Sequence, residues 1–401
     1  MKSRPDVDFW SLTESYEGGW HLQTYFLCLS KKVLNSGALK YIFNGGELNN
    51  PQISESSDVE LTKILSAAGF KGMAFIPYSE LNPNLEQSNA NNPVRFLWDR
   101  LIEQFDFPFV KKELLLDNPE NIQNTDKVFA LIQQCSSYPI ENIKQSISDY
   151  LFLHDSQKTF PNKISVLCHL YYPGSVYYFL TRISAVKSPQ TQFIFNLSSF
   201  LYYNEFFCEM LMKHFPGSVV LYTPNQGRDI GGKLAAFDAL LKSGIPSDYS
   251  LVIHDKLSPH SPTGIAWRNK LLKMIDPDVL PKVFRTFNED KKAGIITTRE
   301  LIKNEFDPST KTFMCTSNPN LWNYIEKYNL TTSDYNFAAG TIFWIRTEVA
   351  RNFFLSHPPL SIRKELEKGN SLDFFKGTNT HAWERLFSFI VHAQGFKTIG
   401  I

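Results

Sequence analysis

The stretch from Ser218 to Lys233 reads SVVLYTPNQGRDIGGK, and it decides the fold. Its first five residues form an apolar run that predicts a short buried strand. A glycine-rich turn follows the run and opens a helical pattern from Lys233. A strand that passes through such a turn into a helix predicts a βαβ unit of an α/β domain.

Four other apolar runs of similar length predict further buried strands. They are residues 164–170, 192–195, 250–253 and 294–297. Helical stretches such as 232–243 and 267–275 lie between them. We therefore predict a mainly parallel, Rossmann-type sheet flanked by helices over residues 161–401, with ligands bound at the carboxyl ends of the strands.

At 401 residues the chain exceeds one ordinary hydrophobic core, so a second module is expected. Helical periodicity over 126–160 predicts a linker between the two. The sequence also contains a faint repeat. An apolar strand at 24–29 is followed by Glu60 and by a Gly-Phe-Lys triplet at 69–71. The same order recurs with a strand at 341–346, Glu384 and a Gly-Phe-Lys triplet at 395–397. We interpret residues 1–125 as a truncated module related to the C-terminal half of the second one.

Composition excludes several classes of protein. The 41 basic and 40 acidic residues give a net charge of +1, so no nucleic acid is expected as a partner. The five cysteines are widely spaced, without the pairs that build zinc or redox sites. The chain has no apolar run of about 20 residues and no secretory signal, so we expect a cytoplasmic location, compatible with peripheral attachment at the inner face of the plasma membrane.

The turn at 225–232 is the strongest candidate binding motif. Backbone N–H groups at a helix N-terminus, here those around Asn225 and Gly227, suit a diphosphate. Arg228 adds a bidentate phosphate donor, and Asp229 orients Arg228 or accepts hydrogen bonds from sugar hydroxyls. The alternative is an ordinary turn in which Asp229 caps the helix.

A second polar cluster follows the apolar run 250–253 and consists of His254, Asp255, Lys256, Ser258 and His260. The cluster has one carboxylate, Asp255, among cationic side chains. We therefore predict that these cations neutralise a diphosphate without a metal. In the alternative, Asp255 and a histidine hold Mg²⁺ or Mn²⁺. Arg268 either reaches the same phosphates or lies on a helix surface.

Two further sites complete the prediction. His169 and Tyr171 follow the first strand of the second module, where a base or ribose could stack; a structural histidine is the alternative. Glu384 is the candidate general base, because a sugar transfer with inversion needs a carboxylate beside the acceptor hydroxyl. Since successive helix residues do not share a face, a Glu384–Arg385 ion pair is not expected.

Motifs along nearly the whole chain carry a resemblance to a known family. They are Asp8-Phe9-Trp10, His21-Leu22-Gln23-Thr24-Tyr25-Phe26, Phe96-Leu97-Trp98-Asp99, His169-x-Tyr171-Tyr172, Asn225-x-Gly227-Arg228-Asp229-Ile230, His254-x-Lys256, Trp267-Arg268, Gly340-Thr341-Ile342-Phe343-Trp344 and Trp383-Glu384-Arg385. With these motifs the chain resembles the rhamnan synthesis protein F family, glycosyltransferases of rhamnose-containing polysaccharides.

The resemblance implies a GT-A-like fold, a nucleotide-diphosphate sugar donor such as dTDP-L-rhamnose, and a lipid-linked oligosaccharide acceptor. On this basis we assign acceptor contacts to Trp344, His381 and Trp383, and catalysis to Asp229 and Glu384. The rival hypothesis is a non-catalytic protein that binds a glycan or scaffolds a partner glycosyltransferase. An epimerase is disfavoured because no Gly-x-Gly-x-x-Gly follows the first strand.

Overall fold

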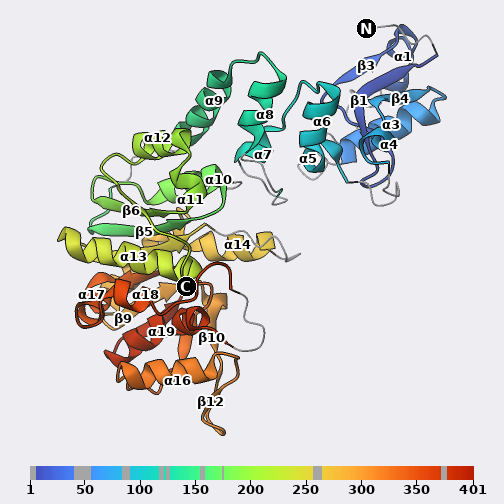
Figure 1. Ribbon diagram of the computed structural model, residues 1–401. Coiled ribbons are helices and arrows are strands. Elements are labelled where there is room, and N and C mark those ends of the chain that lie inside the picture. Colours follow the sequence, from blue (N-terminus) through green and yellow to red (C-terminus); the bar gives the residue numbers. More distant parts are fainter. Residues whose placement is uncertain are drawn as a thin grey trace. The chain divides into compact units, whose positions relative to one another are not determined.

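A computed structural model describes residues 6–39, 56–83, 91–116, 122, 127–153, 159–173, 176–255, 264–371 and 377–401. The chain divides into two compact units (Figure 1). The N-terminal unit is Met1–Leu115 with Ile122–Ile140, and the C-terminal unit is Leu116–Asn121 with Glu141–Ile401. The later division, at residue 140, falls within the stretch 126–160 that periodicity marks as a linker.

A seven-stranded sheet forms the centre of the C-terminal unit, in the order β15-β9-β14-β8-β5-β6-β7. Its strands are β5 (Ile164–Leu170), β6 (Thr191–Leu197), β7 (Val219–Tyr222), β8 (Tyr249–His254), β9 (Ala293–Thr297), β14 (Phe343–Arg346) and β15 (Lys397–Gly400). All five predicted strands are present. β14 is antiparallel to both of its neighbours, whereas every other pairing in the sheet is parallel.

Helices cover both faces of this sheet (Figure 1). The helices of the unit are α9 (Ile140–Leu153, whose first residue is assigned to the other unit), α10 (Val176–Ile183), α11 (Ser199–Tyr202), α12 (Glu205–His214), α13 (Arg228–Ser243), α14 (Gly264–Leu272), α15 (Leu280–Glu289), α16 (Asn318–Lys327), α17 (Thr347–Ser356), α18 (Pro359–Arg363) and α19 (Asn379–Ala393). Short strands β10 (Ile302–Asn304) and β13 (Asn336–Ala338) pair with each other, as do β11 (Phe306–Asp307) and β12 (Thr312–Phe313). The α/β prediction is thus confirmed.

Successive side chains of β14 point to opposite faces of the sheet and pack against different helices. Phe343 packs against Phe387 of α19, with ring centroids 5.6 Å apart. The next residue, Trp344, points to the opposite face and packs against Phe284 of α15 at 5.4 Å. Both β14 residues are fully buried, as expected for a strand whose two faces are covered by helices.

The N-terminal unit contains a smaller sheet. Its strands are β1 (Phe9–Ser15), β2 (His21–Leu22), β3 (Leu27–Leu29) and β4 (Gly72–Ile76). Its helices are α1 (Lys31–Leu34), α3 (Ser56–Ala67), α4 (Tyr78–Leu81), α5 (Pro93–Phe96), α6 (Trp98–Phe105), α7 (Lys112–Leu116, whose last residue is assigned to the other unit) and α8 (Val128–Cys135). Phe9, Leu22, Leu65 and Ala74 form one of its cores.

The strand pairing of the two units is related. In the N-terminal unit β1 is antiparallel to β3 and parallel to β4, and in the C-terminal unit β9 is antiparallel to β14 and parallel to β15. Before β4 and β15 the chain turns at Gly69 and Gly395, with φ of 80° and 78°. The repeat predicted from the sequence therefore has a counterpart in the topology.

Among the described residues, no helix combines the length and the apolar character that crossing a membrane requires.

Candidate functional site

The candidate site lies where the strand order of the larger sheet reverses. The strands β7, β6, β5 and β8 stand side by side, so the chain runs outward from β5 in one direction and then returns to its other side with β8. In sheets of this kind ligands bind at the carboxyl ends of the strands, at this reversal. His169 near the end of β5 is paired with His254 at the end of β8.

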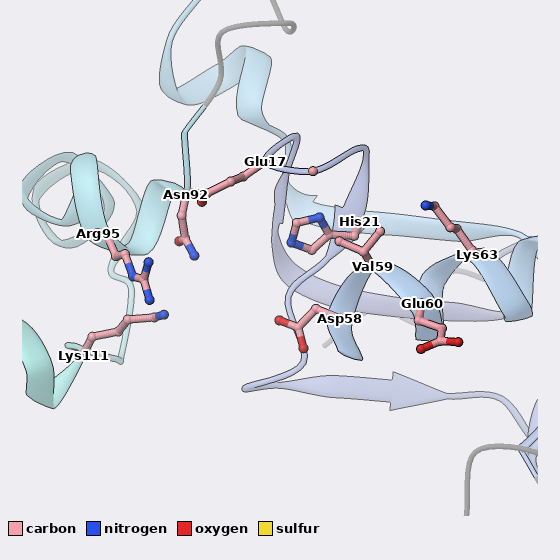
Figure 2. A pocket seen from close by; sticks show the side chains of 10 residues that line it. Glu17, His21, Asp58, Val59, Glu60, Lys63, Asn92, Arg95 and Lys111 are labelled. Carbon is pink, nitrogen blue, oxygen red and sulfur yellow. The ribbon is translucent and has the colours of Figure 1, made fainter. Parts of the chain in front are cut away.

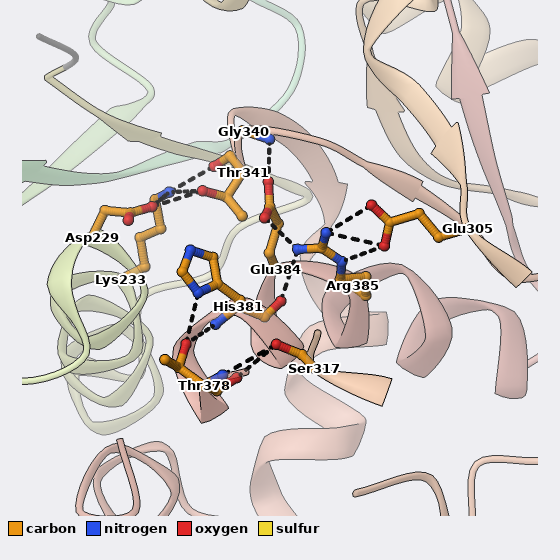
Figure 3. Close-up of polar contacts among 10 residues, drawn as sticks. All are labelled: Asp229, Lys233, Glu305, Ser317, Gly340, Thr341, Thr378, His381, Glu384 and Arg385. Atoms are coloured by element: carbon orange, nitrogen blue, oxygen red, sulfur yellow. Dashed lines mark hydrogen bonds and ion pairs between the residues drawn. The ribbon is translucent and has the colours of Figure 1, made fainter. Parts of the chain in front are cut away.

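A buried lysine joins the turn at 225–232 to the end of β8. Lys233, on the second turn of α13, is fully buried. Its Nζ, which has three N–H groups, lies within hydrogen-bond distance of four acceptors: Asp229 Oδ2 at 2.8 Å, His254 Nδ1 at 2.9 Å, and the carbonyl and hydroxyl oxygens of Thr341 at 2.8 and 2.5 Å. Thr341 Oγ1 donates in turn to Asp229 Oδ2 at 2.7 Å (Figure 3).

This network fixes the charge of Asp229. Burial alone opposes ionisation, but the Lys233 ammonium beside it holds the pKa of Asp229 well below its usual range. The side chain of Asp229 is 28% exposed, and its Oδ1 has no partner among the described residues. Asp229 is therefore an ionised acceptor with one free oxygen, and a poor proton acceptor.

The same lysine fixes the tautomer of His254. An ammonium group can only donate, so Nδ1 of His254 must accept and the ring proton must be on Nε2. His254 is therefore neutral while Lys233 holds it. The sequence-based prediction that His254 is one of the cations around a diphosphate is wrong for this arrangement.

His169 is also neutral. Burial lowers the pKa of His169 to about 4. Its Nδ1 lies 2.9 Å from Nδ2 of Asn196, whose Oδ1 accepts from Thr223 Oγ1 at 2.9 Å. A Cβ on Gly232 would lie 2.2 Å from the same Nδ1, so the second glycine of the Gly-Gly pair allows α13 to approach the histidine ring.

The turn before α13 presents Arg228 to the site. Gly227 and Arg228 both have positive φ, 73° and 51°, and the N–H of Gly227 already donates to the Glu367 carbonyl at 2.7 Å. The Arg228 guanidinium makes no hydrogen bond or ion pair with any described residue. Its side chain is half-buried, and its charge opposes the burial that raises the pKa of Tyr172 to about 12.

Asn225 and Tyr171 meet through a third segment. Asn225 Nδ2 donates to Asn370 Oδ1 at 2.9 Å, and Asn370 Nδ2 lies 3.3 Å from the Tyr171 hydroxyl. Gly369 N donates to the carbonyl of Asn225 at 2.8 Å. The chain around 369–370 therefore ties the β5 loop to the turn before α13.

Asp255 is held by backbone rather than by cations. Its Oδ2 accepts from the N–H groups of Tyr171 and Tyr172 at 2.9 and 2.6 Å. The other oxygen, Oδ1, is buried without a partner among the described residues. Burial raises the pKa of Asp255 to about 7, and the nearby charge of Asp229 adds to the increase.

Glu384 reaches the same segment as Asp229. Its Oε1 accepts from the N–H of Gly340 at 2.7 Å, the residue before Thr341 (Figure 3). Its Oε2 accepts from Arg385 Nη1 at 2.6 Å, and Arg385 also forms a two-pronged pair with Glu305. The expectation that Glu384 and Arg385 do not pair is wrong, because the long arginine side chain folds back along the helix, where Nη1 also donates to the His381 carbonyl.

The family model of rhamnan synthesis protein F matches residues 1–396, nearly the whole chain. This chain belongs to the rhamnan synthesis protein F family. Membership implies involvement in the synthesis of a rhamnan polysaccharide. No curated protein sequence matches the chain.

In this family member, two of the predicted acceptor contacts take other positions. Trp344 and Trp383 are fully buried, and Trp344 Nε1 donates to the Met274 carbonyl at 3.0 Å, so the two rings belong to the core rather than to an acceptor surface. Arg268 is buried, with its guanidinium 4.6 Å from the centre of the Tyr178 ring, so the alternative of a helix-surface arginine is wrong, and its contact with phosphates stays a prediction. His381 stays half-buried and bonds Thr378 Oγ1 through Nδ1 at 2.7 Å.

Part of the predicted site lies outside the described residues, namely Lys256, Ser258 and His260. Within the described residues, no three His, Cys, Asp or Glu side chains form a group that could hold a metal ion. The alternative in which Asp255 and a histidine hold a metal stays a prediction, because His260 lies outside the described residues.

Sequence reasoning missed Lys233 and Thr341. One signal was available: Asp229 and Lys233 are four residues apart on a helix, the spacing at which opposite charges meet. The contribution of Thr341 could not be read locally, because it comes from a segment 108 residues further along the chain.

Proposed function

We propose that this chain is a GT-A-like glycosyltransferase that moves a sugar, L-rhamnose by the family's name, from a nucleotide diphosphate onto a growing rhamnan chain. The observation that carries the proposal is the convergence of the turn before α13 with the end of β8 through Lys233. Strand order supports it as well, since β7-β6-β5 has the 3-2-1 order of a mononucleotide-binding half, with β8 beside β5 at the switch point.

In this proposal the diphosphate lies at the N-terminus of α13. The first N–H groups of any helix lack partners within the helix and favour an anion. Arg228 supplies the positive charge, because His169 and His254 are neutral. The Nε2–H group of His169 acts as a neutral donor to sugar or phosphate oxygens.

The two carboxylates have different roles. Asp229 remains ionised and offers Oδ1 to a hydroxyl of the donor, whereas Lys233 and Thr341 hold its other oxygen. Glu384 is the candidate base that removes the acceptor proton as the sugar carbon is attacked. Gly340 and Arg385 orient it, and its side chain is 21% exposed.

A thermal-shift screen of nucleotide sugars, with and without Mn²⁺, tests the donor site, because a ligand that binds the folded state raises the melting temperature. We expect stabilisation by dTDP-L-rhamnose. Release of free rhamnose from the donor, or its transfer to a rhamnan oligosaccharide, then establishes turnover. Retained glycan binding without turnover of any nucleotide sugar would instead support the non-catalytic alternative.

A further inference from the structure

The N-terminal unit contains a pocket of its own, of about 600 Å³ (Figure 2). The pocket is lined by Glu17, Gly18, His21, Asp58, Val59, Glu60, Lys63, Asn92, Arg95 and Lys111. All ten residues belong to this unit, so the pocket does not depend on the placement of the other. None of them contributes to the site around Lys233.

The pocket has two polar walls. Helix α3 provides Asp58, Glu60 and Lys63, while Arg95 of α5 and Lys111 face Asp58 from the other side (Figure 2). Glu113 bonds both cations of that second wall, at 2.8 Å from Arg95 Nε and 3.5 Å from Lys111 Nζ. Two cations thus share one carboxylate, and the Lys111 ammonium, which has three N–H groups, keeps donors for a ligand.

Two lining side chains are fixed by their own unit. The carbonyl of Gly19 lies 2.8 Å from His21 Nδ1, which must therefore donate, and this bond fixes the orientation of the ring. Asp58 accepts from the hydroxyl and the N–H of Thr24. Both side chains are held in place before any ligand arrives, which lowers the entropic cost of binding.

The lining indicates the chemical class of the ligand. It carries three acidic and three basic side chains, so it does not favour a strongly charged ligand. Val59 is the one aliphatic side chain among the ten lining residues, so the pocket does not favour an apolar ligand either. A sugar hydroxyl both donates and accepts, and matches carboxylates on one wall and N–H groups on the other.

The fold gives a second reason to expect a saccharide here, through the role at the acceptor proposed for Glu384. Asp58 on α3 and Glu384 on α19 precede the positive-φ glycines Gly69 and Gly395 by the same number of residues. Each carboxylate accepts from a backbone N–H just before the strand that corresponds in the two units, that of Thr24 before β3 and that of Gly340 before β14. The structural counterpart of Glu384 is therefore Asp58, and the sequence-based match to Glu60 is wrong.

We propose that this pocket is a second saccharide site, which binds a segment of the rhamnan chain away from the donor site. The proposal rests on the proposed function for the choice of rhamnan as the saccharide. It assigns to the N-terminal unit the role of holding the polymer while the C-terminal unit holds the donor.

Equilibrium dialysis of the full chain with a labelled oligosaccharide of α-linked rhamnose tests this proposal. The test variant combines Glu60→Gln and Lys111→Gln, which remove the carboxylate charge of one wall and the ammonium charge of the other, and with them the charge-assisted hydrogen bonds to a ligand. Its matched control combines Glu80→Gln and Lys31→Gln, two exposed residues of the same unit that do not line the pocket. We expect saturable binding by the wild type and the control, and binding weaker by about tenfold or more in the test variant.

Equal affinity of the wild type and the test variant, or no binding by the wild type, would overturn the second site. Binding of dTDP-L-rhamnose by the same preparations separates this outcome from a failure of the proposed function. Donor binding without oligosaccharide binding would reject the second site alone. Oligosaccharide binding that depends on the pocket residues, without donor binding, would support the site and reject the transferase.

Discussion

Lys233 Nζ lies 2.9 Å from Nδ1 of His254 and donates to it. This contact connects α13, which follows the glycine-rich turn, with the end of β8. It also keeps His254 neutral, so Arg228 is the cation that the described site offers to a diphosphate. The fold and the charge of the site both depend on one buried ammonium group.

Replacement of Lys233 by methionine should destabilise the protein by about 3–5 kcal/mol, because it leaves the buried side of Asp229 without its counter-ion. Lys242→Met is the matched control. Lys242 pairs with Asp238 at the same four-residue spacing on α13, but its side chain is 70% exposed. The control should change the free energy of unfolding in urea by less than about 1 kcal/mol. Equal losses in the two variants would contradict the role given to Lys233.

Asp255 should make the protein less stable as the pH rises from 4 to 7. Its pKa is raised to about 7 in the folded state, against 3.8 for the unfolded chain. Between these values the folded state binds more protons, so the free energy of unfolding falls by up to about 1.4 kcal/mol per pH unit. The variant Asp255→Asn lacks this contribution. The difference in the free energy of unfolding, variant minus wild type, should therefore rise from pH 4 to 7 and level off above pH 7. Urea unfolding at several pH values measures it. If the two proteins lose stability in parallel over this range, the raised pKa of Asp255 is contradicted.

Alanine at Gly232 should destabilise the protein, although alanine usually favours a helix. Its Cβ would lie 2.2 Å from His169 Nδ1, and such overpacking costs about 1–3 kcal/mol. Gly37→Ala, where a Cβ meets nothing within 4 Å, serves as the control and should stay within about 0.5 kcal/mol. If Gly232→Ala has the melting temperature of the wild type, the close approach of α13 to His169 is contradicted.

Glu384→Gln should abolish most transfer while donor binding persists. Glutamine still accepts from the Gly340 N–H but cannot take a proton, and loss of a general base lowers rates by about 10²–10⁴-fold. The exposed Glu348→Gln on α17 should retain full activity. Transfer at the wild-type rate by Glu384→Gln would assign the base to another residue.

Local patterns predicted much of the fold because buried strands and the glycine-rich turn have local signatures. The helix expected from Lys233 begins at Arg228, since the turn is completed by positive φ at Gly227 and Arg228, which periodicity does not show. Trp344 was expected to contact an acceptor, but burial of a strand residue depends on whether helices cover both faces of its sheet.

The site was only partly predictable for a similar reason. The sequence pointed to Asp229 and His254, but not to the lysine and threonine that set their charge states. Thr341 lies between β13 and β14, 112 residues after Asp229 in the sequence, so no local pattern could place the two side chains together. The shift from Glu60 to Asp58 in the repeat also became visible only once both helices could be aligned on the glycines that follow them.

Equilibrium binding of dTDP-L-rhamnose to the wild type and to Arg228→Ala tests the central claim most directly, with the exposed Arg285→Ala on α15 as control. Loss of a charge-assisted bidentate contact should weaken donor binding by about 10- to 100-fold. The melting temperature should stay unchanged, because Arg228 bonds no described residue. Donor affinity that is the same in all three proteins would contradict a diphosphate site at the start of α13.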